Sequence, residues 1–190
     1  MMGKLIRTLL VVIVGSILAS SAVEAASLKG VTLADTIAVT GQELTLNGIG
    51  MRKKLIFNVY VTGLYLPKKT TDAAVAITTN AAKQIVMVFV HSKVAQEKIV
   101  AAWNDGFFNN SQEKLSLLQD RINQFNGFFN RDMVKGDRVE LTYQPALGTT
   151  VTINGTKQGI IPGEDFMQAL WSIWLGNNPA DARLKEALLG

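Results

Sequence analysis

The chain contains no cysteine and a single histidine, His91. Without thiols, neither disulfides nor thiolate metal sites can form, so the fold must be held together by packing. One histidine also excludes the common zinc and non-haem iron sites, which need several. We therefore expect no metal and no cofactor. A hydrolytic triad needs a histidine beside its nucleophile, but His91 ends a predicted strand, where local hydrogen bonding is the simpler explanation.

The excess of positive over negative charge is also small. The formal net charge is +4, and basic pairs such as Lys53-Lys54 are short and are not interleaved with aromatic residues. Nucleic-acid binders commonly carry a longer basic stripe, so nucleic acid is not an expected partner. No glycine-rich loop follows a strand and opens a helix, so the usual backbone cradle for nucleotide phosphates is absent from the sequence.

Long apolar runs are confined to the beginning of the chain. Lys4 and Arg7 precede an apolar run from Leu9 to Leu18, and small residues follow around Ala25. Basic residues, a short apolar run and a small-residue cleavage site are typical of a secretory signal peptide. The run has about ten residues, fewer than the roughly 20 that a spanning helix needs.

These features predict a signal peptide over residues 1–25 and one domain over residues 26–190. We expect an exported, periplasmic protein with no membrane span after cleavage. The alternative is an uncleaved anchor, although apolar runs this short rarely remain in the bilayer.

The remaining sequence alternates between strand-like and helical patterns. Apolar residues recur at helical spacing from Ala95 to Phe107 and again from Leu115 to Phe129, which predicts two helices broken at Asn109-Asn110. Two later helices are expected, one from Glu164 to Gly176 and one that Asn178 caps and Pro179 begins. The tryptophans on these helices are expected to pack in the core: Trp103, Trp171 and Trp174.

Strands are predicted before and between these helices. The segment from Thr149 to Ile161 is expected to form a hairpin with its turn at Asn154-Gly155. Further strands are predicted at residues 31–39, 43–47, 46–67, 83–90 and 138–143. The order indicates an α+β fold, with a large mainly antiparallel sheet covered by a helical layer.

The run from Leu46 to Pro67 carries an arginine, Arg52, into an otherwise apolar strand. Alternation along an extended chain places Arg52 and Tyr60 on the same face. Burying a guanidinium without a partner costs several kcal/mol, so an Arg52 that faces a cavity predicts an anionic ligand there. A carboxylate fits, held by the guanidinium and by the Tyr60 hydroxyl. Alternatively, Arg52 belongs to a solvated basic turn with Lys53 and Lys54.

Several short motifs resemble the chalcone isomerase-like proteins. They are Gly50-Met51-Arg52, Val59-Tyr60, Gly63-Leu64-Tyr65-Leu66 and Ile161-Pro162-Gly163, and the resemblance extends over nearly the whole chain after the signal peptide. It implies an open-faced sandwich with a ligand cleft between the sheet and the helices. The family includes plant enzymes that close the chalcone ring, fatty-acid-binding members and exported bacterial members.

The resemblance also implies roles for particular residues. An arginine at the position of Arg52 faces the substrate oxygen in the enzymes and the carboxylate in the fatty-acid binders, where a tyrosine similar to Tyr60 assists. The enzymes have a threonine in place of Tyr60, and their other polar cleft residues match Ala95, Ala102 and Ile173. These departures favour a binding protein for a fatty acid or a similar apolar carboxylate, with these three residues as possible cleft positions.

Two alternatives stay open. One is an isomerase or lyase acting on a phenolic or unsaturated substrate, in which Arg52 stabilises a developing oxyanion. The other is an envelope interaction protein that has no small ligand.

The separation of Arg52 and Tyr60 is a difficulty for the binding hypothesis. They are eight residues apart, and a straight strand would separate their Cα atoms by roughly 26 Å. Either the chain turns back near Lys53-Lys54, or a bulge bends it, or Tyr60 contributes elsewhere in the cleft.

Overall fold

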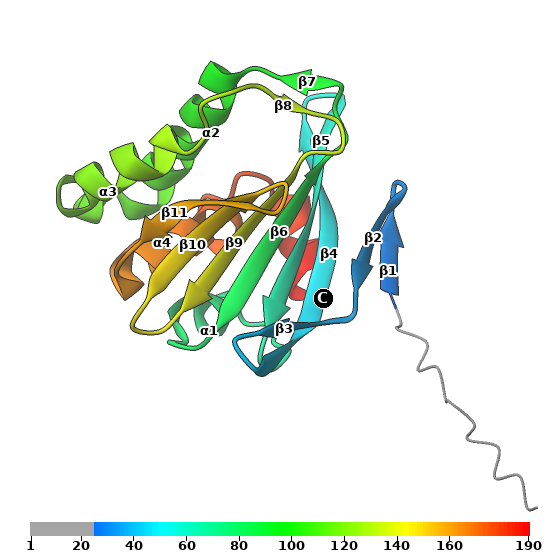
Figure 1. Cartoon of the computed structure of the whole chain (residues 1–190), viewed down its shortest axis with the longest axis horizontal. Helices are drawn as coiled ribbons and strands as arrows, with labels where there is room; N and C mark the ends of the chain where they lie inside the picture. The colour runs from blue at the N-terminus through cyan, green and yellow to red at the C-terminus, as the bar shows by residue number, and fades with distance from the viewer. Residues whose placement is uncertain (1–24) are drawn as a thin grey trace, which may run out of the picture.

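The computed structural model describes residues 25–190, which form a large curled sheet covered by helices (Figure 1). The predicted signal peptide, residues 1–25, lies outside the described residues except for Ala25, which begins β1. Seven strands pair antiparallel in the order β11-β10-β9-β6-β5-β4-β3. Their bounds are β3 (Thr36–Val39), β4 (Gln42–Lys54), β5 (Phe57–Leu66), β6 (Lys83–Phe89), β9 (Arg138–Gln144), β10 (Gly148–Ile153) and β11 (Thr156–Ile161).

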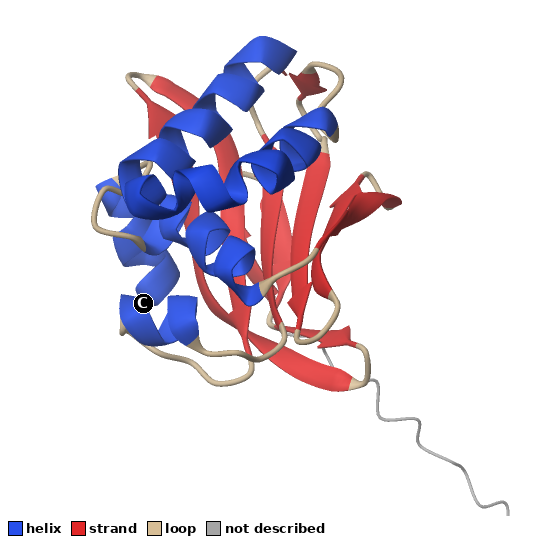
Figure 2. Cartoon of the chain, turned by 90° about the vertical axis from the view of Figure 1, so that its left-hand side faces the viewer, coloured by secondary structure: helices blue, strands red, loops and turns tan. Residues whose placement is uncertain are grey.

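The helices gather on one side of this sheet (Figure 2). They are α1 (Ala73–Thr78), α2 (Gln96–Ser111), α3 (Leu115–Gly127), α4 (Glu164–Leu175) and α5 (Ala182–Leu189). The predicted α+β class with an antiparallel sheet and a helical layer is confirmed. The main core lies between the layers, and the three tryptophans are buried there as expected. Within residues 25–190, no helix is long and apolar enough to cross a membrane.

A long crossover between β6 and β9 contains α2 and α3. A short ribbon of β7 (Lys93–Val94) and β8 (Met133–Val134) joins its two ends, and a 3₁₀ turn over Gln112–Lys114 separates the helices. The break therefore falls slightly after the predicted position at Asn109-Asn110. Asn110 lies inside α2, where its side chain donates to the Gly106 carbonyl at 3.0 Å.

The other face of the sheet carries a smaller core. A ribbon of β1 (Ala25–Leu28) and β2 (Val31–Ala34) supplies the buried Leu33. Tyr65 belongs to this cluster, and its hydroxyl donates to the Ala34 carbonyl at 2.8 Å. The β1–β2 ribbon therefore covers part of this face of the sheet.

The predicted single strand from Leu46 to Pro67 is wrong. The chain reverses at Leu55-Ile56, so that β4 and β5 form an antiparallel hairpin. Leu55 adopts a φ of 55°, a left-handed conformation that is uncommon for a side chain of this kind. Because hairpin turns of this type usually carry glycine or asparagine, the sequence gives no ordinary turn signal here.

The predicted start of the last helix is also wrong. Asn178 does not cap it and instead bonds to the end of α2. Its backbone nitrogen donates to the Asn110 side-chain oxygen and its side-chain nitrogen donates to the Asn109 carbonyl, each at 3.0 Å. Asp181 is the cap instead, accepting from the backbone nitrogens of Arg183 and Leu184 at 3.0 and 3.2 Å. This position brings Asp181 beside the β4–β5 hairpin.

Asp137, between β8 and β9, gives a pH-dependent prediction. Arg131 forms a two-point ion pair with it at 2.7 and 3.1 Å, and the pKa of Asp137 falls to about 2, chiefly through this interaction. A carboxylate whose pKa is lower in the folded state stabilises the fold above its unfolded pKa. We therefore expect the free energy of unfolding to decrease as the pH falls from about 4 to about 2.

The measurement is urea unfolding across this pH range. Asp137→Asn should lose about 2 kcal/mol at neutral pH and flatten the acid slope. Asp120→Asn, at an exposed helical position, is the control and should keep the wild-type slope. An unchanged slope in Asp137→Asn would refute this role.

Candidate functional site

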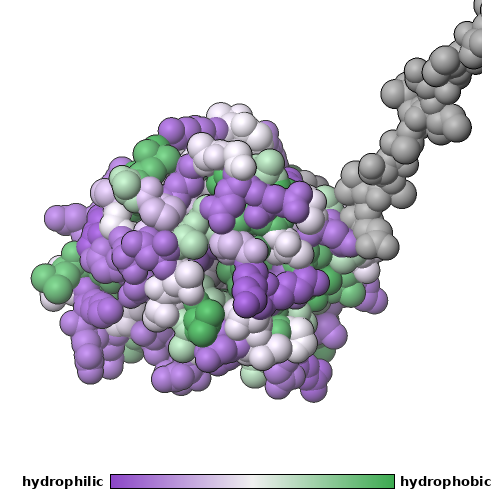
Figure 3. Space-filling model, turned by 90° about the horizontal axis from the view of Figure 1, so that it is seen from below, coloured by the Kyte–Doolittle hydropathy of each residue, from purple (hydrophilic) through white to green (hydrophobic). Residues whose placement is uncertain are grey.

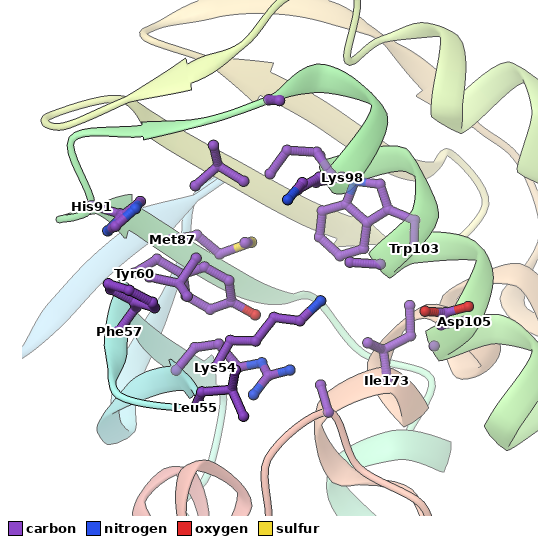
Figure 4. Close-up of a pocket in the computed structure, with 18 of the residues that line it drawn as sticks. Lys54, Leu55, Phe57, Tyr60, Met87, His91, Lys98, Trp103, Asp105 and Ile173 are labelled. Atoms are coloured by element: carbon purple, nitrogen blue, oxygen red, sulfur yellow. The ribbon is translucent and has the colours of Figure 1, made fainter.

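A cavity of about 800 Å³ lies between the sheet and the helical layer (Figure 4). Its walls come from the β4–β5 hairpin, β6, α2, α4 and the loop that precedes α5. The lining includes every site residue predicted from the sequence: Arg52, Tyr60, Ala95, Ala102 and Ile173. The fold therefore brings together residues from three separate parts of the chain.

The hairpin removes the distance difficulty between Arg52 and Tyr60. The register of β4 and β5 pairs these two residues directly across the hairpin, next to a bulge between Arg52 and Lys53. Directly opposed residues have Cβ atoms about 5 Å apart, so both side chains can contact one small group. Of the three possibilities above, the first holds: the chain turns back, at Leu55-Ile56 immediately after Lys53-Lys54.

Arg52 is held in place by Asp181. The Arg52 side chain is 21% exposed, and its Nη1 lies 3.5 Å from the Asp181 carboxylate and donates to the Lys53 carbonyl. The same Asp181 oxygen accepts from the Lys53 backbone nitrogen at 3.1 Å. Both contacts use Nη1, whereas a guanidinium has five N–H donors. Arg52 is thus largely buried and partly neutralised, unlike the solvated Lys53 and Lys54.

Tyr60 presents a neutral hydroxyl to the cavity. Its ring is buried against Phe89, with ring centroids 5.6 Å apart, and its oxygen accepts from Trp174 Nε1 at 3.1 Å. Burial raises the pKa of Tyr60 to about 12, although the nearby Arg52 opposes this effect. The hydroxyl therefore stays protonated at neutral pH. Among residues 25–190, no protein acceptor bonds to its proton.

The wall opposite Tyr60 is largely apolar. Ala95 at the N-cap of α2 and Ala102 within the helix line this wall. Trp103 on α2 and Ile173 on α4 complete it (Figure 4). Trp103 is buried, and its Nε1 has no hydrogen-bond partner in the described part of the chain. α2 approaches α4 closely at Gly106, where an added Cβ would lie 2.7 Å from the Ile173 side chain. This wall offers carbon surface for an apolar ligand.

Sequence reasoning missed other residues that line the cavity. They include Lys54, Leu55, Phe57, His91 and Lys98. His91 contacts Phe57 edge to face, with ring centroids 5.5 Å apart. The expected strand-end position of His91 is right, but no local pattern indicated that it faces a cavity. Within residues 25–190, no cluster of three or more His, Asp or Glu could hold a metal ion.

Comparisons with known proteins agree with this fold. The model of a family described as chalcone isomerase-like matches residues 25–190. A crystal structure of a fatty-acid binding protein from Arabidopsis thaliana is similar, with a TM-score of 0.68 and 16% sequence identity over 87% of this chain and 96% of that chain. At this identity the likeness shows the fold alone. No curated protein sequence matches this chain significantly.

Proposed function

The chain belongs to the chalcone isomerase-like family, and from this premise we propose that it is an exported binding protein for a fatty acid or a similar apolar carboxylate. The observation that carries the proposal is the pairing of Arg52 with Tyr60 across one hairpin, both lining one cavity. A carboxylate at this position would accept charge-assisted hydrogen bonds from the guanidinium and a further bond from the hydroxyl.

The rest of the cavity suits an apolar chain. Its volume of about 800 Å³ falls within the roughly 300–1,000 Å³ of typical ligand cavities. Met87, Ile99 and Ile173 contribute apolar lining from the sheet and from both helices. One solved structure with this fold, the Arabidopsis protein, is named as a fatty-acid binding protein, which supports the same class of ligand here.

The two alternatives have weaker support. Isomerase chemistry needs polar groups around the substrate, yet Ala95, Ala102 and Ile173 present only carbon at the positions where the enzymes carry polar side chains. Turnover of a chalcone that Arg52→Ala abolishes would restore that alternative. A protein without a small ligand should have a filled cleft and a solvated Arg52, whereas here the cavity is open and Arg52 is paired.

Tyr60→Phe tests the second half of the carboxylate site. Loss of one hydrogen bond to a charged group should weaken fatty-acid binding about tenfold. The measurement is displacement of a fluorescent fatty acid by palmitate from the purified protein.

Tyr143→Phe is the matched control for Tyr60→Phe. The Tyr143 hydroxyl donates to Asn80 at 2.8 Å and does not line the cavity. This variant should bind palmitate like the wild type. Equal affinity in Tyr60→Phe and the wild type would remove Tyr60 from the site.

A further inference from the structure

The turn of the β4–β5 hairpin exposes three consecutive apolar side chains. Leu55, Ile56 and Phe57, hereafter the hairpin tip, are 90%, 87% and 52% exposed. Single exposed apolar residues are ordinary on protein surfaces and need no explanation. Three in a row on a tight turn are different, because turns usually carry glycine, asparagine or aspartate. The hairpin tip therefore requires a partner that removes it from water.

The hairpin tip lies at an opening of the cavity. Leu55 and Phe57 line the cavity and are also exposed, so the cavity reaches the surface beside them. In Figure 4, Leu55 and Phe57 stand on one side of the cavity, and Lys98 on α2 stands across from them. A ligand that enters here passes directly over the apolar tip.

Unpaired lysines surround this opening. Lys53 and Lys54 precede the hairpin tip, and Lys98 faces it from α2. In the described part of the chain none of the three forms an ion pair, whereas Lys93 nearby is paired with Asp132 at 2.6 Å. Of the acidic residues on this side, Asp181 is held by Arg52 and Asp132 by Lys93. Glu97, in the first turn of α2, acts on Lys93, and Asp105 lies further along the helix. The opening therefore combines apolar side chains with free positive charge.

The opposite end of the sheet has the exposed lysines Lys68 and Lys69 but, among the described residues, no run of consecutive exposed apolar residues. Figure 3 shows that end, where hydrophilic side chains predominate and the apolar ones are scattered. The β9–β10 connection there carries Leu147, a single exposed leucine. The strand register places Leu147 at the far end from the hairpin tip, because β6 pairs its first residue with Tyr143 and its last with Tyr60.

We propose that the hairpin tip docks into the surface of an anionic lipid bilayer, so that the cavity exchanges fatty acids with the membrane. Leu55 and Ile56 enter the acyl boundary while the lysines extend their stems and keep their ammonium groups among the lipid phosphates. A projecting tip fits a bilayer without any preformed groove, which a protein partner would have to supply. The proposal rests on the proposed function, since the fatty acid is the cargo.

A site-specific label tests the docking. Because the chain has no cysteine, Ile56→Cys introduces a single thiol that can carry an environment-sensitive nitrobenzoxadiazole dye. Vesicles that contain phosphatidylglycerol should shift its emission to the blue and raise it several-fold. Leu147→Cys with the same dye is the control and should not respond. The label reports only on its own position, so vesicle contacts made elsewhere in the chain do not produce this signal.

The charge dependence is tested with Lys53→Glu, at an exposed position outside the cavity lining. Reversing this charge should weaken binding to the anionic vesicles about tenfold, and pure phosphatidylcholine vesicles should bind the wild type more weakly. Equal binding of Lys53→Glu and the wild type to anionic vesicles would contradict the role of the lysines.

Fatty-acid transfer connects the tip to the cargo. Ile56 does not line the cavity, so Ile56→Ser should keep the wild-type affinity for soluble fatty acid while slowing uptake from anionic vesicles about tenfold. Leu147→Ser should transfer at the wild-type rate.

The outcomes separate the two proposals. A label at position 56 that stays silent with anionic vesicles, in a protein that binds soluble fatty acid, overturns the docking and leaves the proposed function intact. A label that responds in a protein without fatty-acid binding overturns the proposed function and leaves the docking. An equal response at positions 56 and 147 overturns the docking.

Discussion

Arg52→Ala is expected to weaken fatty-acid binding by about 10- to 100-fold, the largest loss of any single change in the cavity. The variant removes the charged donors that would meet the carboxylate. It also removes the partner that lies 3.5 Å from the Asp181 carboxylate, which leaves Asp181 as an uncompensated negative charge beside the ligand. Calorimetric titration of the purified protein with palmitate measures the effect.

Two further variants sharpen this test. Arg121→Ala removes an arginine that forms a two-point pair with Asp165 at 2.6 and 2.7 Å and does not line the cavity, so affinity should not change. Arg52→Lys keeps the charge but loses the planar fork and should fall between the wild type and Arg52→Ala. If Arg52→Ala binds palmitate as tightly as the wild type, Arg52 is not the anchor.

Gly48→Ala is expected to lower the free energy of unfolding by about 3 kcal/mol. Gly48 lies in β4 beside a register shift, where α5 packs directly on the strand. An added Cβ would lie 2.3 Å from the Ala187 carbonyl oxygen and 2.6 Å from that of Leu188. Both atoms belong to the helix backbone, so α5 as a whole must move. Urea unfolding measures the loss.

Gly127→Ala is the control for this prediction. Gly127 ends α3, and an added Cβ there meets nothing within 4 Å, so stability should stay equal or rise by a few tenths of a kcal/mol. Because Asp181 is the N-cap of α5 and holds Arg52, Gly48→Ala should also bind fatty acid more weakly. A Gly48→Ala variant as stable as the wild type would show that α5 does not pack this closely.

The two hairpins show which turns could be predicted. Asn154 and Gly155 have φ angles of 50° and 77°, values that asparagine and glycine tolerate, and the sequence predicts their turn correctly. Leu55 has a φ of 55° without either residue type, so no local signal marks the β4–β5 turn. It was expected only as one way to bring Arg52 and Tyr60 together. Its apolar side chains suited a continuous strand, and tertiary structure overrides that local preference.

The candidate site could also be predicted only in part from the sequence. Alternation along the chain placed Arg52 and Tyr60 on one face, but the turn at Leu55-Ile56 makes them neighbours. Trp174 was expected only to pack, yet it also donates to the Tyr60 hydroxyl, a contact across 114 residues that no local pattern encodes. His91 and Lys98 face the cavity because of how the β6–β9 crossover folds back over the sheet. Such long-range placement cannot be read from spacing.

A crystal structure of the protein with a fatty acid that carries bromine at its tail tests the central claim most directly, because bromine scattering fixes the ligand's direction. We expect the carboxylate at hydrogen-bond distance, about 2.7–3.2 Å, from both the Arg52 guanidinium and the Tyr60 hydroxyl, with the bromine among apolar side chains. A carboxylate bound beside Lys54 and Lys98 without contact to Arg52, or an empty cavity at saturating ligand, would contradict it.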